Sequence, residues 1–275
     1  MLSATRPSHK IVLMESSKMS ATFSDYAEYY DLLYKDKDYK KEAEYVVALI
    51  RKFHLGNPGG IHILDLACGT GRHAFELENM GFSIEGSDHS QSMIERARAA
   101  ARERGGGTQF YNHSFQTAGL LGKKYDVIIS MFSAINYLVT YRDFSLAMQN
   151  IGSLLAENGI FVFDYWNGNA VLRDHSPSRV LRKRAGDMEV VRTSETTIDP
   201  REQLARVRFT FLCLKNSLKK AEFEEIHHIR YFHFKEMETL LNINGFQIVY
   251  ISPFMNLDKP VQPYDWNISV VAKKT

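Results

Sequence analysis

The sequence predicts an α/β fold in which a doubly wound sheet carries an inserted antiparallel β-sheet. Apolar runs alternate with helix-forming stretches from residue 59 to residue 165, which is typical of a parallel sheet with helices on its faces. After residue 170, β-rich stretches follow one another without helices between them, as in an antiparallel sheet. A chain of 275 residues is long enough for one such domain with an insertion.

The N-terminal region divides into a polar tail and a helical segment. Residues 1–22 show no periodic pattern. Apolar residues then recur at helical spacing across Tyr39–Phe53, and Gly56–Gly60 breaks that helix before the first strand. The expected parts of the chain are a flexible tail (1–22), a helical cap (23–58), a cofactor-binding core (59–175), an inserted antiparallel sheet (176–233) and the end of the core (234–275).

The most informative stretch, Ile61–His73, predicts a buried strand, a glycine-rich turn and the start of a helix. Asp65 ends the apolar run of the strand. Gly69 and Gly71 allow the backbone to approach a ligand where a Cβ atom would clash. The helix expected over Ala74–Met80 offers its first N–H groups to electron-rich ligand atoms.

Two classes of ligand use such a loop. Gly69, Gly71 and Ala74 satisfy the dinucleotide fingerprint G-x-G-x-x-G/A. Asp65, Ala67 and the same two glycines satisfy the longer pattern of S-adenosylmethionine loops, in which an acid stands two positions before a small residue. A glycine motif alone does not separate these classes, so both stay open at this point.

The second strand is expected over Phe82–Asp88, and it ends in an acid. Either cofactor carries a ribose whose hydroxyl groups bind a carboxylate at this position, so Asp88 is the expected ribose ligand. A simpler role for Asp88 is to cap the following helix, for which Ser90 is the other candidate. The two roles are compatible.

The remaining strands follow from shorter patterns. The insertion is expected to hold strands over Met188–Ser194, Gln203–Leu214 and Glu222–Phe234, before a helix over Lys235–Asn244. The other strands of the core are expected near Gln109–Asn112, Tyr125–Ser130, Leu154–Asp164, Gln247–Ile251 and Asn267–Lys273. Together with the first two strands, they make a Rossmann-like, doubly wound sheet of seven strands.

The segment from Gly86 to Arg98 separates the two ligand classes. Its order, Gly-Ser-Asp-His-Ser-x-x-Met-Ile-x-x-Ala-Arg, resembles the second cofactor motif of class I S-adenosylmethionine-dependent methyltransferases. The resemblance implies that Asp88 holds ribose, that Met93 flanks adenine and that His89 belongs to the same cofactor site. Further matches follow in the same order at Tyr125–Leu138 and Leu154–Asp164.

The chain departs from this family at two points. After the third strand the family usually has Gly-Asp, whereas this chain has His113-Ser114. The resemblance therefore assigns the adenine contacts to Ser114 and the backbone of Phe115, and it places the Met131 carbonyl near the methionine part of the cofactor. Before the fifth strand, Glu157-Asn158-Gly159 replaces the usual Pro-Gly-Gly.

One branch of the family matches further. Tyr29–Ala43, Met131–Leu138 and Glu225–His227 resemble sugar N-methyltransferases that act on nucleotide-linked amino sugars, and relatives encoded beside polysaccharide genes. In such relatives the N-terminal segment closes over the cofactor. The resemblance thus implies cofactor contacts for Tyr34 and Tyr39, and a substrate contact for Tyr30.

The same resemblance implies a catalytic or substrate-positioning role for Tyr137 and His227. The alternatives are a half-buried packing role for Tyr137 and a surface position on a strand for His227. Further expected substrate contacts are Asn136, Trp166 and Arg182.

Two of these substrate contacts have their own arguments. Trp166 lies at the carboxyl end of the fifth strand, at the edge of the sheet that faces the ligand crevice. Arg182 belongs to a basic run, Arg179–Arg184, which suits either a nucleotide diphosphate or a solvated charged segment.

The expected function is S-adenosylmethionine-dependent methylation of a small molecule, with an amino group of a sugar or related metabolite as the leading acceptor. The protein has to hold the nucleophile in line with the methyl carbon, and an amine nucleophile must be neutral. Two alternatives remain. One is a dinucleotide-dependent oxidoreductase, and the other is a non-catalytic methyltransferase-like binding module.

Composition bounds the partners. The net charge of +2 gives no indication of a nucleic-acid partner, and no apolar run has the length of a membrane span. No histidine or cysteine spacing indicates a metal site. With only two cysteines, Cys68 and Cys213, we expect a reducing compartment, the cytoplasm. A homodimer formed through the inserted sheet is one alternative for the assembly.

Overall fold

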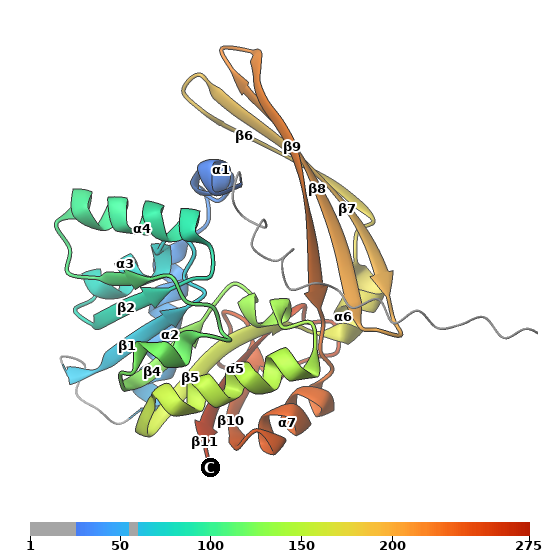
Figure 1. The fold of residues 1–275 in the computed structure, drawn as a ribbon. Coiled ribbons are helices and arrows are strands. Elements are labelled where there is room, and N and C mark those ends of the chain that lie inside the picture. The colour runs from blue at the N-terminus through green and yellow to red at the C-terminus, as the bar shows by residue number, and fades with distance from the viewer. Residues whose placement is uncertain (1–25, 55–59) are drawn as a thin grey trace, which may run out of the picture.

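The computed structural model describes residues 26–54 and 60–275, and these residues form two separate sheets (Figure 1). One is a seven-stranded sheet with helices on both faces, and the other is a four-stranded antiparallel sheet. The predicted class, a Rossmann-like doubly wound sheet with an inserted antiparallel sheet, is confirmed. The tail expected over residues 1–22 lies outside the described residues.

The central sheet has the strand order β10-β11-β5-β4-β1-β2-β3. Its strands are β1 (His62–Leu66), β2 (Ser83–Ser87), β3 (Gln109–Tyr111), β4 (Tyr125–Ser130), β5 (Leu155–Trp166), β10 (Phe246–Pro253) and β11 (Asn267–Lys274). All pairs from β3 to β5 are parallel, whereas β11 runs antiparallel to both of its neighbours. The order reverses between β1 and β4, and ligands of open α/β sheets bind at such a switch point.

Two hydrophobic cores cover the two faces of this sheet. Alternate residues of β1 divide between them, with Ile63 in one core and Leu64 in the other. The first core contains residues of α2 (Tyr39–Phe53), α3 (Arg72–Asn79) and α4 (Gln91–Arg104), and the second contains residues of α5 (Tyr141–Leu154) and α7 (Phe234–Ile243). Because both faces are buried, the strands are nearly continuous apolar runs.

The helix expected over Tyr39–Phe53 is α2, and its cause is visible in the sequence. Asp38 caps it by accepting a hydrogen bond from the Lys41 N–H at 3.0 Å. Val46 and Ile50, one helical turn apart, are fully buried against the sheet. Within the described residues, no helix is both long and apolar enough for a membrane span.

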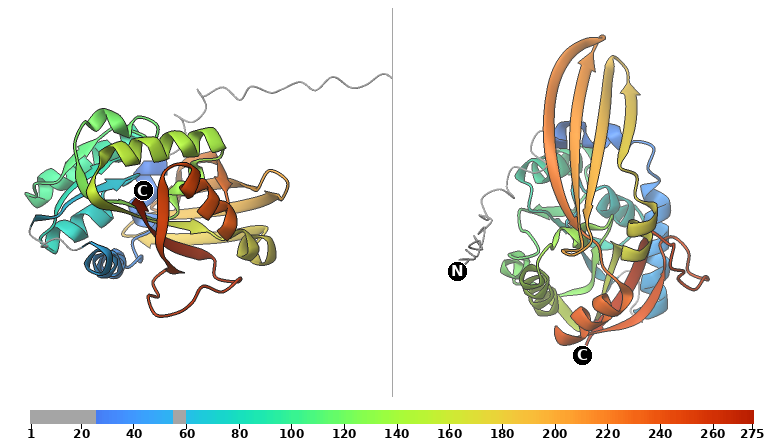
Figure 2. Two further views of the ribbon diagram at one scale, coloured as in Figure 1. Left: turned by 90° about the horizontal axis from the view of Figure 1, so that it is seen from below. Right: turned by 90° about the vertical axis from the view of Figure 1, so that its right-hand side faces the viewer.

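The inserted sheet is an antiparallel meander that projects from the core beyond α6 (Gly168–Asp174) (Figure 2). Its strands are β6 (Ser178–Ala185), β7 (Met188–Asp199), β8 (Leu204–Lys215) and β9 (Leu218–Arg230). Asn216 and Ser217 join β8 to β9 with positive φ angles of 51° and 65°, which suit the twist of a tight hairpin. One face of the sheet, which includes Val207, Phe211 and His227, is buried.

The sequence analysis missed β6 and set β9 too late. β6 was seen only as a basic run, because as an edge strand it is mostly exposed and lacks the apolar alternation that predicts strands. The strand expected over Glu222–Phe234 runs instead from Leu218 to Arg230, since the hairpin turn at Asn216 starts it earlier.

Helix α1 (Tyr26–Leu33) lies between the core and the inserted sheet (Figure 1). A small hydrophobic cluster joins the three parts: Ala27 and Leu33 of α1, Met93 of α4 and Phe211 of β8. The inserted sheet is therefore held to the cofactor half through α1, as well as through its own connections to β5 and α7.

Candidate functional site

The glycine-rich loop after β1 has the backbone that close approach to a ligand requires. Ala67, Gly69 and Gly71 have positive φ angles of 66°, 56° and 80°. A Cβ atom on Gly71 would lie 2.6 Å from the Phe110 ring, so only glycine fits there. The Ala67 N–H donates to the Ser87 carbonyl at 2.7 Å, which ties the loop to the end of β2.

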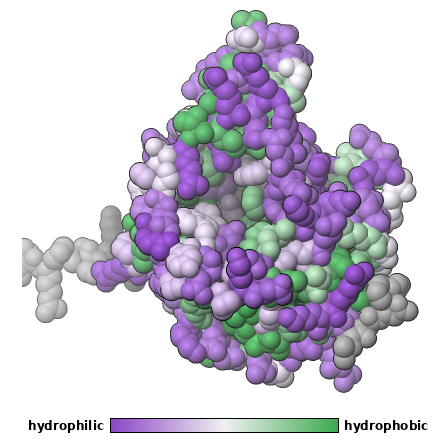
Figure 3. Space-filling model, turned by 180° about the vertical axis from the view of Figure 1, so that it is seen from behind, coloured by the Kyte–Doolittle hydropathy of each residue, from purple (hydrophilic) through white to green (hydrophobic). Residues whose placement is uncertain are grey.

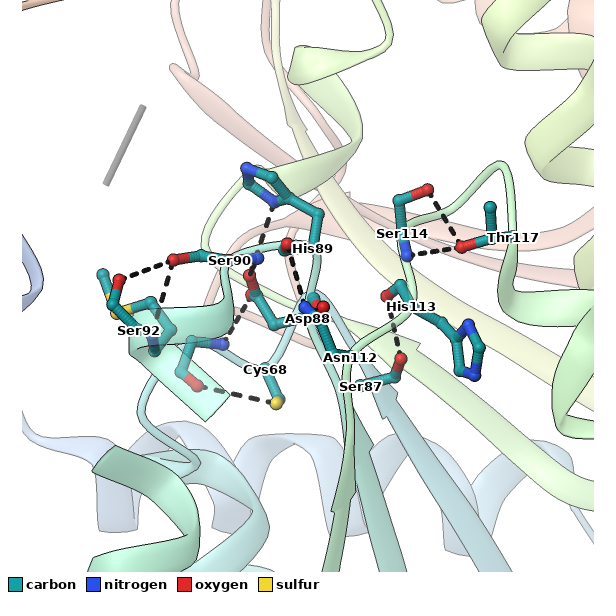
Figure 4. Close-up of polar contacts among 12 residues, drawn as sticks. Cys68, Ser87, Asp88, His89, Ser90, Ser92, Asn112, His113, Ser114 and Thr117 are labelled. Atoms are coloured by element: carbon teal, nitrogen blue, oxygen red, sulfur yellow. Dashed lines mark hydrogen bonds and ion pairs between the residues drawn. The ribbon is translucent and has the colours of Figure 1, made fainter. Parts of the chain in front are cut away.

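Asp88 links this loop to α4 (Figure 4). Its Oδ2 accepts a hydrogen bond from the Gly69 N–H at 2.9 Å, and its Oδ1 accepts one from the Ser90 N–H at 2.8 Å. Ser90, not Asp88, is the N-cap of α4 and accepts from the Met93 N–H at 3.4 Å. Asp88 thus supports the start of α4, and its ribose role stays a prediction.

Asp65 is a buried carboxylate at the carboxyl end of β1. It is 1% exposed, and its Oδ2 has no hydrogen-bond partner among the described residues. Burial raises the pKa of Asp65 to about 6, with a further rise from Asp88 and an opposing effect from His73. An acceptor atom of this kind suits a cationic group of a ligand.

The residues expected around adenine surround the ends of β2 and β3 (Figure 4). Ser114 forms a turn in which its N–H donates to Thr117 Oγ1 at 2.9 Å. Phe115 is buried, and the His113 carbonyl accepts a hydrogen bond from Ser87 Oγ at 2.8 Å. Met93 is buried in the hydrophobic cluster that joins α1, α4 and β8. The side chain of His89 lies 3.4 Å from the Asp88 carboxylate.

The expected N-terminal tyrosines lie close to the loops of the core. The rings of Tyr34 and Phe132, the latter in the loop after β4, are 5.1 Å apart. Tyr30 packs on Tyr34 at 4.8 Å, and Tyr39 packs edge-on against His73 at 5.0 Å. The segment that carries these tyrosines therefore covers the carboxyl edge of the sheet.

The loop after β4 is held in an uncommon conformation by a residue that the sequence analysis did not single out. Phe132 and Ser133 have positive φ angles of 63° and 56°. The N–H and Oγ of Ser133 donate to the Asp164 carboxylate at 3.0 and 2.7 Å. Burial raises the pKa of Asp164, which is fully buried, and its bonds to Ser133 oppose that rise. Met131, just before this loop, is buried.

A second buried charged cluster was also missed. Glu42 of α2 pairs with Lys37 and with His73 Nε2, the latter at 2.7 Å. Burial acts to raise the pKa of Glu42, but the contacts with His73 and Lys37 outweigh it and lower that pKa. An acid inside the amphipathic α2 was the signal in the sequence, and its partner on α3 was not predictable from spacing.

Tyr137 and His227 come together from distant parts of the chain. The Tyr137 hydroxyl is 2.7 Å from His227 Nδ1, and His227 Nε2 is 3.1 Å from Glu225 Oε2. His227 is 2% exposed, so the alternative of a surface position for it is wrong. Tyr137 is half-buried, as its packing alternative expects, but its hydroxyl has a protein partner.

Two of the expected substrate contacts lie beside this pair. Asn136 is fully buried, and its Oδ1 accepts a hydrogen bond from the Trp166 N–H at 3.3 Å. Trp166 packs on Trp266 at 5.5 Å between ring centroids, and it belongs to the same hydrophobic cluster as Tyr137. Seen from behind, the surface is hollowed where the inserted sheet meets the core, between hydrophilic rims (Figure 3).

The structure does not bring Arg182 to this place. Arg182 pairs with Val191 of β7. Across the sheet, His227 is level with Thr196, which lies five residues after Val191 in the same strand. That separation is about 16 Å along the strand. The Arg182 guanidinium contacts Glu189 at 2.7 Å and is exposed, so its substrate role stays a prediction. Among the described residues, no group of three metal-binding side chains is arranged to hold an ion.

Comparison with known proteins connects this geometry to an enzyme family. A methyltransferase domain matches residues 63–159, which include the glycine-rich loop and Asp88. The chain is 28% identical over 233 residues to a dTDP-3-amino-3,4,6-trideoxy-α-D-glucopyranose N,N-dimethyltransferase of Streptomyces venezuelae, covering 82% of this chain and 92% of that protein. It is 26% identical to the dTDP-3-amino-3,6-dideoxy-α-D-glucopyranose N,N-dimethyltransferase of Streptomyces fradiae, covering 87% and 92%.

A solved structure shares the fold. An S-adenosylmethionine-dependent methyltransferase from Clostridium acetobutylicum ATCC 824 superimposes with a TM-score of 0.76 at 21% identity, covering 91% of this chain and 98% of that one. The match to a methyltransferase domain decides between the two ligand classes that the glycine motif left open, and the dinucleotide alternative falls. The match of residues 63–159 to a methyltransferase domain, with the two curated relatives, confirms the resemblance to class I S-adenosylmethionine-dependent methyltransferases.

Proposed function

We propose that this protein transfers a methyl group from S-adenosylmethionine to an amino group of a sugar or related small metabolite. The observation that carries the proposal is the Tyr137–His227 pair, which lies beside the loop after β4 and has its hydroxyl and imidazole 2.7 Å apart. Such a pair can accept a proton from an amine. The two Streptomyces relatives are named as dimethyltransferases of nucleotide-linked amino sugars, which supports the acceptor class.

The loop fits the cofactor on two observations. A Cβ atom on Gly69 would meet nothing within 4 Å, so the space beside the loop is open to a ligand, and Asp65 presents a buried oxygen without a hydrogen-bond partner in the described structure. When bound, the cofactor supplies a methyl group activated by a positively charged sulfur. In the proposed site, Asp65 faces the cofactor's ammonium group and Asp88 holds its ribose. The other cofactor contacts that we propose are Tyr34, Tyr39, Ala67, Gly69, His89, Met93, Ser114, Phe115 and Met131.

The acceptor is proposed to lie between the core and the inserted sheet. Tyr137 and His227 face its amino group, and Tyr30, Asn136 and Trp166 contact the rest of it. Arg182 stands apart from these residues, so it is proposed to contact only the distant end of a long acceptor, such as a diphosphate.

The test is turnover with matched acceptors. Purified protein is incubated with S-adenosylmethionine and pairs of nucleotide-linked sugars that differ only in carrying an amino or a hydroxyl group at one carbon. Mass spectrometry of the products and release of S-adenosylhomocysteine are measured. We expect one or two methyl groups on the amino member of a pair and none on the hydroxyl member. Turnover of the hydroxyl members alone would contradict the proposed acceptor.

The remaining parts of the proposal concern compartment and assembly. Cys68 and Cys213 are both buried and neither forms a disulfide, which supports a reducing compartment such as the cytoplasm. We also propose a homodimer through the inserted sheet, because β6 is an edge strand in the described structure and edge strands pair readily. Light scattering coupled to size-exclusion chromatography measures the assembly directly, and a monomeric mass would contradict this part.

A further inference from the structure

Three side chains form a hydrogen-bonded chain between the core and the inserted sheet. Tyr137 stands in a short 3-10 helix after β4, and His227 and Glu225 stand two residues apart on β9, with their side chains on the same face of the strand. The first hydrogen bond joins the Tyr137 hydroxyl to His227 Nδ1 at 2.7 Å, and the second joins His227 Nε2 to Glu225 Oε2 at 3.1 Å.

The inner part of this chain is shielded from water. His227 is 2% exposed and Glu225 is 8% exposed. The Phe209 ring of β8 packs edge-on against the imidazole at 4.8 Å, and the Arg192 guanidinium of β7 lies over the Phe209 ring, 4.7 Å from its centroid. In such surroundings a carboxylate next to an imidazole orients it strongly, because little solvent screens the contact.

We infer that Glu225 positions His227 so that Tyr137 relays the proton of the acceptor's amino group to the imidazole. The inference rests on the proposed function and adds a residue and a proton path to it. The Glu225 carboxylate accepts the Nε2–H of His227, which leaves the Nδ1 lone pair directed at the Tyr137 O–H. The Tyr137 oxygen can then take a proton from the acceptor's amino group as its own proton passes to His227.

The step balances in atoms and charge. The acceptor's ammonium group first gives a proton to the Tyr137 oxygen, while the Tyr137 hydroxyl proton moves to His227 Nδ1. The neutral nitrogen then forms a bond to the methyl carbon as the carbon–sulfur bond breaks, the bonding electrons stay on sulfur, and the positive charge passes from sulfur to the methylated nitrogen. The resulting imidazolium lies against the Glu225 carboxylate, which stabilises its charge.

The surroundings of Tyr137 explain why a relay is needed. Burial raises the pKa of the Tyr137 hydroxyl well above its usual range, with further rises from Tyr34, Glu225 and Asp88 and an opposing effect from Arg192. The Tyr137 side chain is therefore a neutral phenol, not a phenolate, at neutral pH. Tyr137 can take a proton only while it gives its own away, so the basic group must stand behind it.

The experiment compares Glu225→Gln with Glu224→Gln. Glu224 is the adjacent residue of β9, is exposed on the opposite face and contacts Thr210. We expect Glu225→Gln to lower kcat by about 10-fold or more, with an unchanged KM, and the loss to shrink as pH rises, because a neutral amine needs no relay. Glu224→Gln should match the unaltered protein. Equal pH profiles for the two variants would overturn the inference.

A second measurement does not depend on turnover. In protein with 15N-labelled histidines, the NMR signal of His227 is identified by its loss in His227→Asn, with His228→Asn on the opposite face as control. We expect the unaltered protein to show the Nε2–H tautomer and Glu225→Gln to show a mixture. An Nδ1–H tautomer in the unaltered protein would overturn the inference. If no amino acceptor is methylated, the proposed function fails, while the tautomer still decides the role of Glu225.

Discussion

The proposed cofactor half and the proposed acceptor half of the site are built in different ways. In the cofactor half the deciding contacts use backbone atoms, such as the Gly69 N–H on Asp88, 19 residues away. In the acceptor half they use side chains far apart in the sequence, such as Tyr137 and His227, 90 residues apart. A backbone cradle serves one constant ligand, whereas side chains presented by an inserted sheet are free to differ between acceptors.

The largest effect on cofactor binding is expected from a substitution at Gly71, in the glycine-rich loop. Gly71→Ala places a methyl group 2.6 Å from the Phe110 ring at a φ of 80°. We expect S-adenosylhomocysteine affinity to fall by about 100-fold or more, because displacing the loop costs about 3 kcal/mol. Calorimetry measures it, with Gly60→Ala as the control, since a Cβ atom there meets nothing within 4 Å. Unchanged affinity in Gly71→Ala would break the contrast between the two halves.

The acceptor half should lose rate without losing the cofactor. Tyr137→Phe keeps the ring and removes the hydroxyl that contacts His227. We expect kcat to fall by about 100-fold while S-adenosylhomocysteine affinity stays constant. Steady-state kinetics and calorimetry on the same samples test this. Tyr141→Phe, which removes an exposed hydroxyl bonded to Glu236, is the control. A parallel loss of cofactor affinity in Tyr137→Phe would show that the halves are not separable.

The Asp65 carboxylate is expected to destabilise the folded protein while it strengthens cofactor binding. Its pKa is raised to about 6, chiefly by burial, so the folded protein binds a proton that the unfolded chain has already lost. Its carboxylate therefore destabilises the cofactor-free protein increasingly from pH 4 to pH 6, and fully above, by about 2–3 kcal/mol.

Asp65→Asn should remove this penalty. In urea unfolding we expect the variant to equal the unaltered protein near pH 4 and to be more stable at pH 8, while binding S-adenosylhomocysteine more weakly. A difference in stability that does not change with pH would contradict the assignment.

Asp88→Asn sharpens the account of the cofactor half. The amide keeps one acceptor oxygen, so it can serve only one of the Gly69 and Ser90 N–H groups. We expect a loss of about 10-fold in S-adenosylhomocysteine affinity, the effect of about one charge-assisted hydrogen bond. Calorimetry measures it against Asp143→Asn, a half-buried acid at the start of α5. If only kcat fell and the S-adenosylhomocysteine affinity did not change, Asp88 would have to be assigned to the acceptor half instead.

The smallest effect is expected at Arg182. The Arg182 side chain is exposed, and Glu189 keeps Arg184 as a partner when Arg182 is replaced, so Arg182→Gln should change the free energy of unfolding by less than about 1 kcal/mol. Thermal unfolding tests this. If the distant end of the acceptor carries phosphates, KM for a nucleotide-linked acceptor should rise, while KM for the free amino sugar stays the same. Equal changes in KM for both acceptors would contradict the proposed contact between Arg182 and the acceptor.

Local patterns predicted the cofactor half well. The loop from Asp65 to Gly71 and the N-terminus of α4 at Ser90 depend on residues close in sequence, and their backbone requirements are visible in the residue types. By contrast, β6 was missed, because this edge strand is mostly exposed and has no apolar alternation. The contact between Ser133 and Asp164 was also missed, because an acid at the end of a buried strand shows that it needs partners but not which ones.

The sequence alone determined the α/β class, the strand, loop and helix around the glycine motif, and the candidate residues Tyr137 and His227. Only the tertiary structure decided that these two side chains meet, that Glu225 stands behind them and that Arg182 does not join them. The physical reason is the distance along the sequence between the residues that interact. Backbone geometry and helix caps are set by neighbours within a few residues, whereas contacts between a core loop and an inserted strand depend on the register of whole sheets.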